Sequence, residues 1–177
     1  VDEGFFRFAL PTEMGGDNAS SMETIEVLEH LGAIDASVSW NVMLGSEINA
    51  MAVGGMDPEL AKKIYLENPR VVMCGGGGPG TKPPRAERQK DGSVKVWGQN
   101  TFISGCHNAT YFFIGAPLMK GDEPELGEDG MPIFKMWFLP RDQWEIVRTW
   151  DVAGMRGSGS DDVKTEGGIC PAEYTGI

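Results

Sequence analysis

The apolar periodicity of the chain changes near Arg70, and this change limits the possible folds more than any other feature of the sequence. Before it, apolar residues recur at helical spacing; after it, they fall in short runs separated by turn residues. The 25 Gly and 11 Pro favour short strands in most of the chain. The pattern predicts an α+β protein with a helical part at residues 1–69 and an antiparallel β-barrel or sandwich at residues 70–177.

Three segments of the first part carry signals for the start of a helix. Ser20 and Glu23 form a capping box before the first segment, and Asp35 can cap a second. This second segment, around Trp40, is so apolar that we expect it to be buried between other elements. Asp57–Pro58 opens the third.

The second part contains runs of strand length that are bounded by turn residues. An Asp91–Gly92 turn predicts a hairpin between the second and third runs. We expect six to eight short strands in total. The runs are Arg70–Gly75, Arg85–Gln89, Val94–Ser104, Ala109–Ala116, Ile133–Leu139, Trp144–Val147 and Val163–Cys170.

Composition limits the possible partners. The chain of 177 residues has 15 Lys plus Arg against 26 Asp plus Glu, a net charge of −11 with no basic stripe, which argues against a nucleic-acid partner. The longest apolar run, Tyr111–Met119, is too short to span a membrane. Three widely spaced cysteines indicate neither a disulfide framework nor a zinc site and fit a reducing cytoplasm. We therefore expect a soluble cytoplasmic protein without a bound metal. Because the sequence starts at Val1 without an initiator Met, we also expect a truncated chain.

The acidic residues of the second part concentrate in Lys120–Met131. This charged run is most simply a solvated hairpin loop rather than a metal site.

A glycine-rich segment follows the first predicted strand, and Gly75, Gly77 and Gly80 match the G-x-G-x-x-G spacing of dinucleotide-binding turns. Such a turn must open a helix, whereas Lys82–Pro84 favours an extended segment. Two interpretations stay open: a loop that offers backbone N–H groups and the Thr81 hydroxyl to a polar ligand, or a plain connection.

The segment Val94–His107 is the first candidate for chemistry. Two strand-like runs joined at Gly98 predict a strand that bends sharply, with Phe102 and Ser104 on one face. An aromatic ring beside a hydroxyl suits a flat heteroaromatic ligand, although an ordinary half-buried strand contains the same residues. We expect a surface or structural role for His107 rather than a catalytic one.

A second glycine-rich segment, Gly154–Val163, contains one cation, Arg156, and the hydroxyls of Ser158 and Ser160. It is equally consistent with an anion site and with a flexible turn between strands.

These motifs together resemble the acyl-CoA dehydrogenase superfamily, over nearly the whole chain and in the same order. Pro11–Gly16 looks like its Pro-x-x-x-Gly-Gly segment, and Pro58–Asn68 resembles the helix before its middle β domain. Val72–Gly75 stands where the family has a strand leading into Thr-Glu-Pro-x-x-Gly-Ser-Asp, so that Gly80–Thr81 matches the Gly-Ser. Gly98–Ser104 resembles its Gly-x-Lys-x-Trp-Ile-Thr strand.

The resemblance implies a flavin, FAD or FMN, held between the partial N-terminal helical domain at 1–69 and the middle β-barrel domain at 70–177. It places Phe102 beside the isoalloxazine ring and the Ser104 hydroxyl near flavin N5, with Ser104 as the catalytic candidate. The flavin-binding residues that it implies are Met73, Cys74, Gly75, Gly80, Thr81, Phe102, Ile103 and Ser104. The family's C-terminal four-helix domain has no counterpart in the sequence.

Departures from the dehydrogenase pattern point to one branch of the superfamily. Gly75–Gly76 replaces Thr-Glu, and the segments Ser104–Tyr111 and Thr149–Val163 look closer to the two-component flavin monooxygenases. That branch implies an oxygenase that uses reduced flavin from a separate reductase to hydroxylate a small aromatic or heterocyclic substrate, and the family usually forms homotetramers. Two alternatives stay open: an acyl-CoA dehydrogenase, and a non-catalytic β-barrel module that has lost the flavin.

Overall fold

The computed structural model describes residues 2–171 and residue 174. In this part of the chain, three α-helices precede the strands: α1 (Ser21–Ile34), α2 (Ala36–Gly55) and α3 (Pro58–Glu67). The strands are β1 (Met73–Gly75), β2 (Arg85–Arg88), β3 (Val94–Asn100), β4 (Tyr111–Lys120), β5 (Glu123–Pro124), β6 (Phe134–Pro140), β7 (Glu145–Val147) and β8 (Asp162–Cys170). The predicted α+β class is confirmed.

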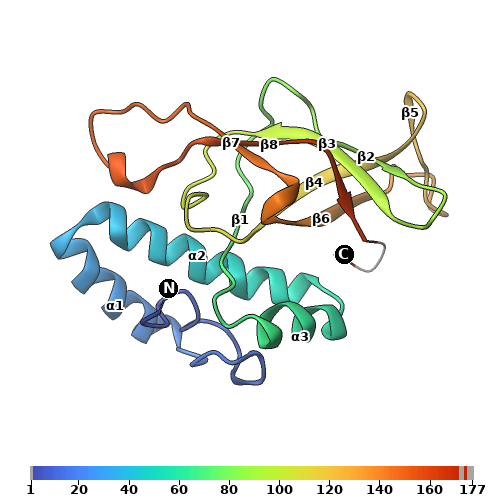
Figure 1. The fold of residues 1–177 in the computed structure, drawn as a ribbon. Coiled ribbons are helices and arrows are strands. Elements are labelled where there is room, and N and C mark those ends of the chain that lie inside the picture. The colour runs from blue at the N-terminus through green and yellow to red at the C-terminus, as the bar shows by residue number, and fades with distance from the viewer. Residues whose placement is uncertain (1, 172–173, 175–177) are drawn as a thin grey trace.

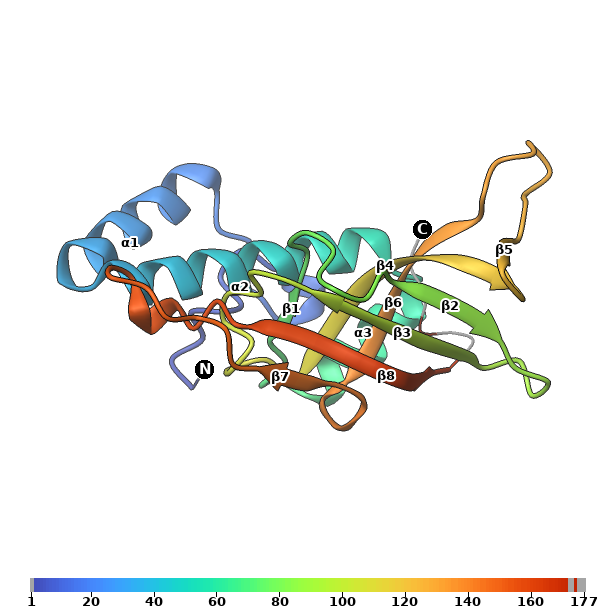
Figure 2. The same ribbon diagram turned by 90° about the horizontal axis from the view of Figure 1, so that it is seen from above.

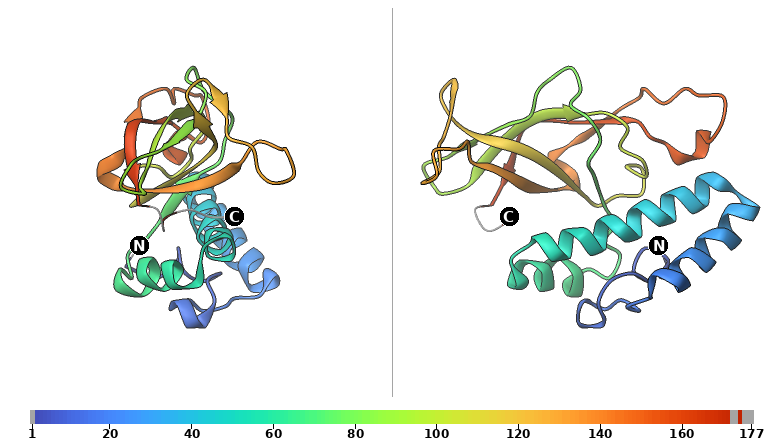
Figure 3. Two further views of the ribbon diagram at one scale, coloured as in Figure 1. Left: turned by 90° about the vertical axis from the view of Figure 1, so that its right-hand side faces the viewer. Right: turned by 180° about the vertical axis from the view of Figure 1, so that it is seen from behind.

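The helices form a layer beneath a curled sheet, as Figures 1 and 2 show, and Figure 3 presents the same arrangement from the end and from behind. Helix α2 lies directly under the sheet, and α1 packs along its far side. The loop between β7 and β8 reaches out from the sheet and lies against the N-terminal half of α2. This loop and α2 therefore meet at one end of the molecule.

The predicted helix starts are confirmed by their hydrogen bonds. Ser20 and Glu23 form the reciprocal capping box of α1, and the Asp35 carboxylate accepts hydrogen bonds from two backbone N–H groups at the start of α2. Asp57 caps α3 in the same way, with Pro58 as its first residue. None of the residues of α1 is buried, however, so its apolar face does not contribute to the core described here.

The sheet is mixed rather than purely antiparallel, which corrects the prediction. Its strand order is β1-β4-β2-β3-β8-β7, with β5 and β6 paired to β4. Strand β4 runs parallel to β1 and β2 and antiparallel to β5 and β6. Hairpin signals reveal only strands that are neighbours in the chain, such as the β2–β3 pair across Gly92, so the sequence could not show these crossover pairings.

Two hydrophobic cores share the strands β1, β4 and β6. Because side chains alternate across a strand, Phe112 and Trp137 point into the curled sheet, whereas Phe113 and Phe138 point toward the helices. Both faces of these strands are therefore buried, which explains why their sequences read as continuous apolar runs. Among the described residues, no helix has the length and apolar character needed to cross a membrane.

Candidate functional site

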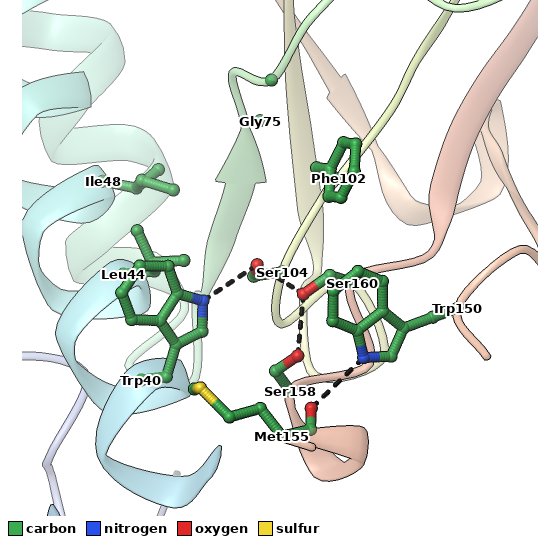
Figure 4. A pocket seen from close by; sticks show the side chains of 11 residues that line it. Trp40, Leu44, Ile48, Gly75, Phe102, Ser104, Trp150, Met155, Ser158 and Ser160 are labelled. Carbon is green, nitrogen blue, oxygen red and sulfur yellow. Dashed lines mark hydrogen bonds between the residues drawn. The ribbon is translucent and has the colours of Figure 1, made fainter. Parts of the chain in front are cut away.

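A cavity of about 340 Å³ lies where α2, the turn after β3 and the β7–β8 loop meet (Figure 4). Its size is at the lower end of the range for small-molecule sites. Most of its lining is apolar or aromatic, with a group of hydroxyls on one side. The lining residues are Trp40, Leu44, Ile48, Gly75, Gly77, Phe102, Ser104, Trp150, Met155, Ser158 and Ser160.

Phe102 and Ser104 both line this cavity, but they do not lie on a strand. Strand β3 runs through Gly98 and ends at Asn100, and the backbone of Phe102 takes a positive φ of 58°. The prediction of one bent strand through Ser104 is therefore wrong. The chain turns at Phe102, and this turn brings the ring and the hydroxyl to the same cavity.

The role of Gly98 is close packing, since a Cβ there would lie 2.7 Å from Pro84 Cα.

An aromatic wall is formed by Phe102 and Trp150, whose rings meet edge to face with centroids 5.8 Å apart. Two consecutive aspartates hold Trp150 in place. Asp161 Oδ1 accepts hydrogen bonds from the backbone N–H groups of Thr149 and Trp150, both at 2.7 Å, and Asp162 Oδ1 accepts one from the Thr149 hydroxyl at 2.9 Å. Two buried carboxylates therefore hold the backbone segment that carries the Trp150 ring.

Asp161 also joins the two loops of the site. Its Oδ2 lies 2.7 Å from His107 Nε2, and its backbone carbonyl accepts a hydrogen bond from Ile103 N–H at 3.0 Å. Burial acts to raise the pKa of the Asp161 carboxyl, but hydrogen bonds from the Trp150 backbone, His107 and the Thr149 backbone outweigh it and hold the pKa below its usual value. The structural role expected for His107 is consistent with this contact.

A chain of hydroxyls forms the polar side of the cavity (Figure 4). The Trp40 indole N–H donates to Ser104 Oγ at 3.0 Å. Ser104 Oγ lies 2.7 Å from Ser160 Oγ, which in turn lies 2.8 Å from Ser158 Oγ. These side chains come from α2, the turn after β3 and the β7–β8 loop, so the hydroxyl chain connects all three elements.

The glycine-rich loop contributes only its first part to the cavity, through Gly75 and Gly77. Gly80 N–H donates to the Gln99 carbonyl at 2.7 Å, and the Thr81 hydroxyl donates to Gln99 Oε1 at 3.3 Å. These donors bind the loop to β3, and no helix follows the loop, in agreement with the rejection of a dinucleotide-binding turn.

The other predicted flavin-binding residues lie behind the cavity rather than on its surface. Met73 belongs to the core between sheet and helices, and Cys74 and Ile103 belong to the core inside the curled sheet, each at most 1% exposed. A direct contact of these three side chains with a ligand therefore stays a prediction, whereas Gly75, Phe102 and Ser104 converge on the cavity.

Sequence reasoning missed the contribution of α2. Trp40 was expected in the core, yet it is 40% exposed and lines the cavity together with Leu44 and Ile48. The unusually apolar face of α2 was the available signal. The β7–β8 loop was considered only as an anion site or a flexible turn; its serines line the cavity, whereas Arg156 bonds to the Val152 carbonyl and pairs with Asp151.

The donor set of this cavity fits a flat ring system with one polar edge. Aromatic side chains supply the walls, and Ser104, Ser158 and Ser160 carry three hydroxyl protons for only two bonds between them. One hydroxyl proton is left for a ligand acceptor. An isoalloxazine ring, with two apolar faces and ring nitrogens along its edge, matches this combination.

No model of a protein family matches the chain. An indole-3-acetate monooxygenase of Acinetobacter baumannii is 30% identical over 172 residues, which cover 97% of this chain and 41% of that protein. The oxygenase component of an FADH2-dependent resorcinol hydroxylase from a Rhizobium species is 30% identical over 156 residues, or 88% of this chain and 35% of that protein. The chain thus spans about two fifths of the length of the curated relatives it matches.

The fold is also found in solved structures. The crystal structure of the HsaA monooxygenase from M. tuberculosis matches with a TM-score of 0.79 and 24% identity, over 98% of this chain and 44% of that one. At this identity, the match establishes the fold alone.

Proposed function

We propose that this chain, which is related to the flavin-dependent monooxygenases of the acyl-CoA dehydrogenase superfamily, builds one wall of the flavin site of an oxygenase component. The observation that carries the proposal is the cavity of Figure 4, in which aromatic walls and a hydroxyl chain meet. The flavin would be FAD or FMN. Bound in reduced form, it would supply the electrons with which oxygen is activated.

The residues of the chain would hold and orient this ring. Phe102 and Trp150 offer aromatic surface to a ring face, and Ser104 offers a hydrogen bond to the polar edge, near N5 in the resemblance. Trp40, Leu44 and Met155 line the cavity with surface that excludes water, which strengthens hydrogen bonds inside and protects reactive species from hydrolysis. Ser104 is accordingly the catalytic candidate.

The substrate and the partner follow from the relatives. Because these act on indole-3-acetate and resorcinol by name, we propose a small aromatic or heterocyclic substrate and a separate flavin reductase. We also propose a homotetramer in the cytoplasm; the three cysteines are buried and widely spaced in the sequence, which fits a reducing compartment. The division at residue 69 into a partial helical domain and a β domain, with a further helical domain completing the flavin site, belongs to the same proposal.

The test uses the whole protein that carries this chain. Purified protein is titrated anaerobically with FADH2 and FMNH2, and then supplied with a flavin reductase, NADH, ¹⁸O₂ and a panel of phenols and indoles. We expect binding of reduced flavin and a product that carries one ¹⁸O atom. Ser104→Ala should lower the yield of product per NADH consumed, whereas Ser93→Ala, in the distant β2–β3 turn, should not.

Two results would contradict the proposal. Failure to bind flavin in either redox state would favour the non-catalytic module. Bleaching of bound oxidised flavin by an acyl-CoA, without oxygen incorporation into any aromatic compound, would favour the dehydrogenase.

A further inference from the structure

Each bond in the hydroxyl chain of the cavity has one donor and one acceptor, and the burial of the three serines determines which hydroxyl donates to which. Three hydroxyl protons serve two bonds, so one proton is left over, and it belongs to Ser158, Ser160 or Ser104. If Ser104 and Ser158 both donate to Ser160, the proton left over is that of Ser160. If Ser104 donates to Ser160 and Ser160 to Ser158, the proton left over is that of Ser158. In the opposite direction, the Ser104 proton is free instead.

Burial disfavours the arrangements that leave the proton of Ser158 or of Ser160 without a partner. Ser158 is 2% exposed and Ser160 is 4% exposed, and Ser158 Oγ has no hydrogen-bond partner besides Ser160 among the described residues. An unpaired hydroxyl proton at Ser158 or at Ser160 would lose its hydration without gaining a protein partner, which is unfavourable. All three serines line the cavity, but Ser104 is the only one of them that is partly buried instead of buried, so its proton can reach solvent or a ligand. The favoured order runs from Ser158 through Ser160 to Ser104.

Trp40 determines the role of Ser104 Oγ in a second hydrogen bond. An indole N–H can only donate, so Ser104 Oγ must accept at this contact. In the favoured order, Ser104 Oγ accepts from both Trp40 and Ser160, which occupies its two acceptor positions and leaves its own O–H as a donor. Two donors from separate elements also restrict the side-chain rotamer of Ser104.

We propose that Trp40, Ser158 and Ser160 are positioning residues that hold the Ser104 hydroxyl with its proton directed into the cavity. The site therefore selects a ligand that presents a hydrogen-bond acceptor to Ser104. This inference rests on the proposed function, which places the polar edge of the flavin at Ser104; in the oxidised ring, N5 of that edge is the acceptor. It adds that the donor character of Ser104 is set by residues on α2 and on the β7–β8 loop.

A pair of ligands isolates this bond. In 5-deaza-FMN, a C–H group replaces N5, so the ring keeps its shape and loses the acceptor. Dissociation constants for oxidised FMN and 5-deaza-FMN are measured by fluorescence titration of the whole protein. We expect the wild type to prefer FMN by about three- to tenfold, the value of one hydrogen bond. Trp40→Phe and Ser160→Ala should each reduce this preference, and Ser104→Ala should abolish it.

Matched controls separate positioning from general damage. Trp150→Phe removes an indole N–H from the same cavity, but that N–H donates to the Met155 carbonyl, so this variant should weaken both ligands alike and preserve the preference. In a Ser104→Ala background, Trp40→Phe and Ser160→Ala should no longer change the preference, because they act through Ser104.

Three outcomes would overturn the inference. In the first, Trp40→Phe and Ser160→Ala lower the affinity for FMN and for 5-deaza-FMN equally. In the second, these two substitutions change the preference for FMN to the same extent in the Ser104→Ala background as in the wild type. In the third, Ser160→Ala increases the preference for FMN, as expected if Ser104 donates to Ser160. Binding of neither oxidised ligand by a wild type that binds FMNH2 would overturn the inference as well. Failure to bind FMNH2 too would contradict the proposed function, and the inference with it.

Discussion

At the residue scale, Asp161 is the most connected side chain of the site. Its carboxylate receives two backbone N–H groups, contacts His107, and lies 3.6 Å from the Arg148 guanidinium, while only 4% of its side chain is exposed. A carboxylate is the only side chain of this size that accepts at both oxygens. Asp161 therefore holds the Trp150 segment and the turn after β3 in one arrangement.

Asp161→Asn replaces one accepting oxygen by an amide group that donates. The bonds to Thr149, Trp150 and His107 then involve a neutral amide in place of a charged carboxylate, and we expect the free energy of unfolding to fall by about 1–3 kcal/mol. Urea denaturation measures this change. Asp151→Asn is the matched control, because the side chain of Asp151 is 88% exposed in its pair with Arg156 and should contribute almost nothing. Equal effects of the two substitutions would contradict this role of Asp161.

The lowered pKa of Asp161 also predicts a dependence of stability on pH. Because the folded-state pKa lies below that of the unfolded chain, about 3.9, the carboxylate contributes stability that is fully present above about pH 5 and is lost as the pH falls through the folded-state value. The melting temperature should therefore fall less steeply below pH 5 in Asp161→Asn than in the wild type. Parallel curves from pH 7 to pH 3 would show that Asp161 does not contribute.

At the element scale, α2 organises the site, and its glycines show where it is packed tightly. A Cβ at Gly45 would lie 2.3 Å from the buried ring of Phe6, whereas a Cβ at Gly54 would meet nothing within 4 Å. Both positions have ordinary helical backbone in the same helix. They differ only in what surrounds them.

These two positions make a matched pair of substitutions. Gly54→Ala should stabilise the protein by up to about 1 kcal/mol through helix propensity. Gly45→Ala should destabilise it by about 1–3 kcal/mol, because the added methyl displaces Phe6. Thermal unfolding of both variants tests the sign of each change. Stabilisation by both would mean that α2 and the N-terminal segment are not packed as described.

At the scale of the whole molecule, Asn49 joins the helices to the sheet. This fully buried side chain on α2 donates to the carbonyls of Phe6 and Val71, and its Oδ1 accepts from the Met73 backbone and the Tyr65 hydroxyl. Its hydrogen bonds thus reach the N-terminal segment, α3 and β1. Burial raises the pKa of Tyr65, so its hydroxyl stays protonated and able to donate even in alkaline solution.

Asn49→Asp keeps the shape of this side chain and removes both donors. The carboxylate would face the carbonyls of Phe6 and Val71 without solvent, so we expect a loss of about 3 kcal/mol or more in the free energy of unfolding. The same substitution at the exposed Asn108 should change stability by less than about 0.5 kcal/mol. Equilibrium denaturation followed by circular dichroism compares the two, and similar midpoints would contradict the role of Asn49.

The sequence by itself determined the local features of this protein. Capping residues such as Ser20 and Asp35 act on backbone groups within a few positions, and the Gly92 turn fixes the register of its own hairpin, so these elements could be predicted. The family resemblance likewise followed from short motifs in order, and it identified Phe102 and Ser104, which do line the cavity.

The tertiary structure decided everything that depends on contacts between distant segments. The parallel pairing of β4, the turn at Phe102 and the meeting of Trp40 with Ser104 and Ser160 have no local signal, because each depends on the packing of residues far apart in the chain. The sequence around Ser158 and Ser160 is equally consistent with an anion site and with a flexible turn, and only the packing of α2 against the β7–β8 loop places these serines at the cavity. A hydrogen bond needs a partner at about 3 Å, and only the fold supplies partners at that distance.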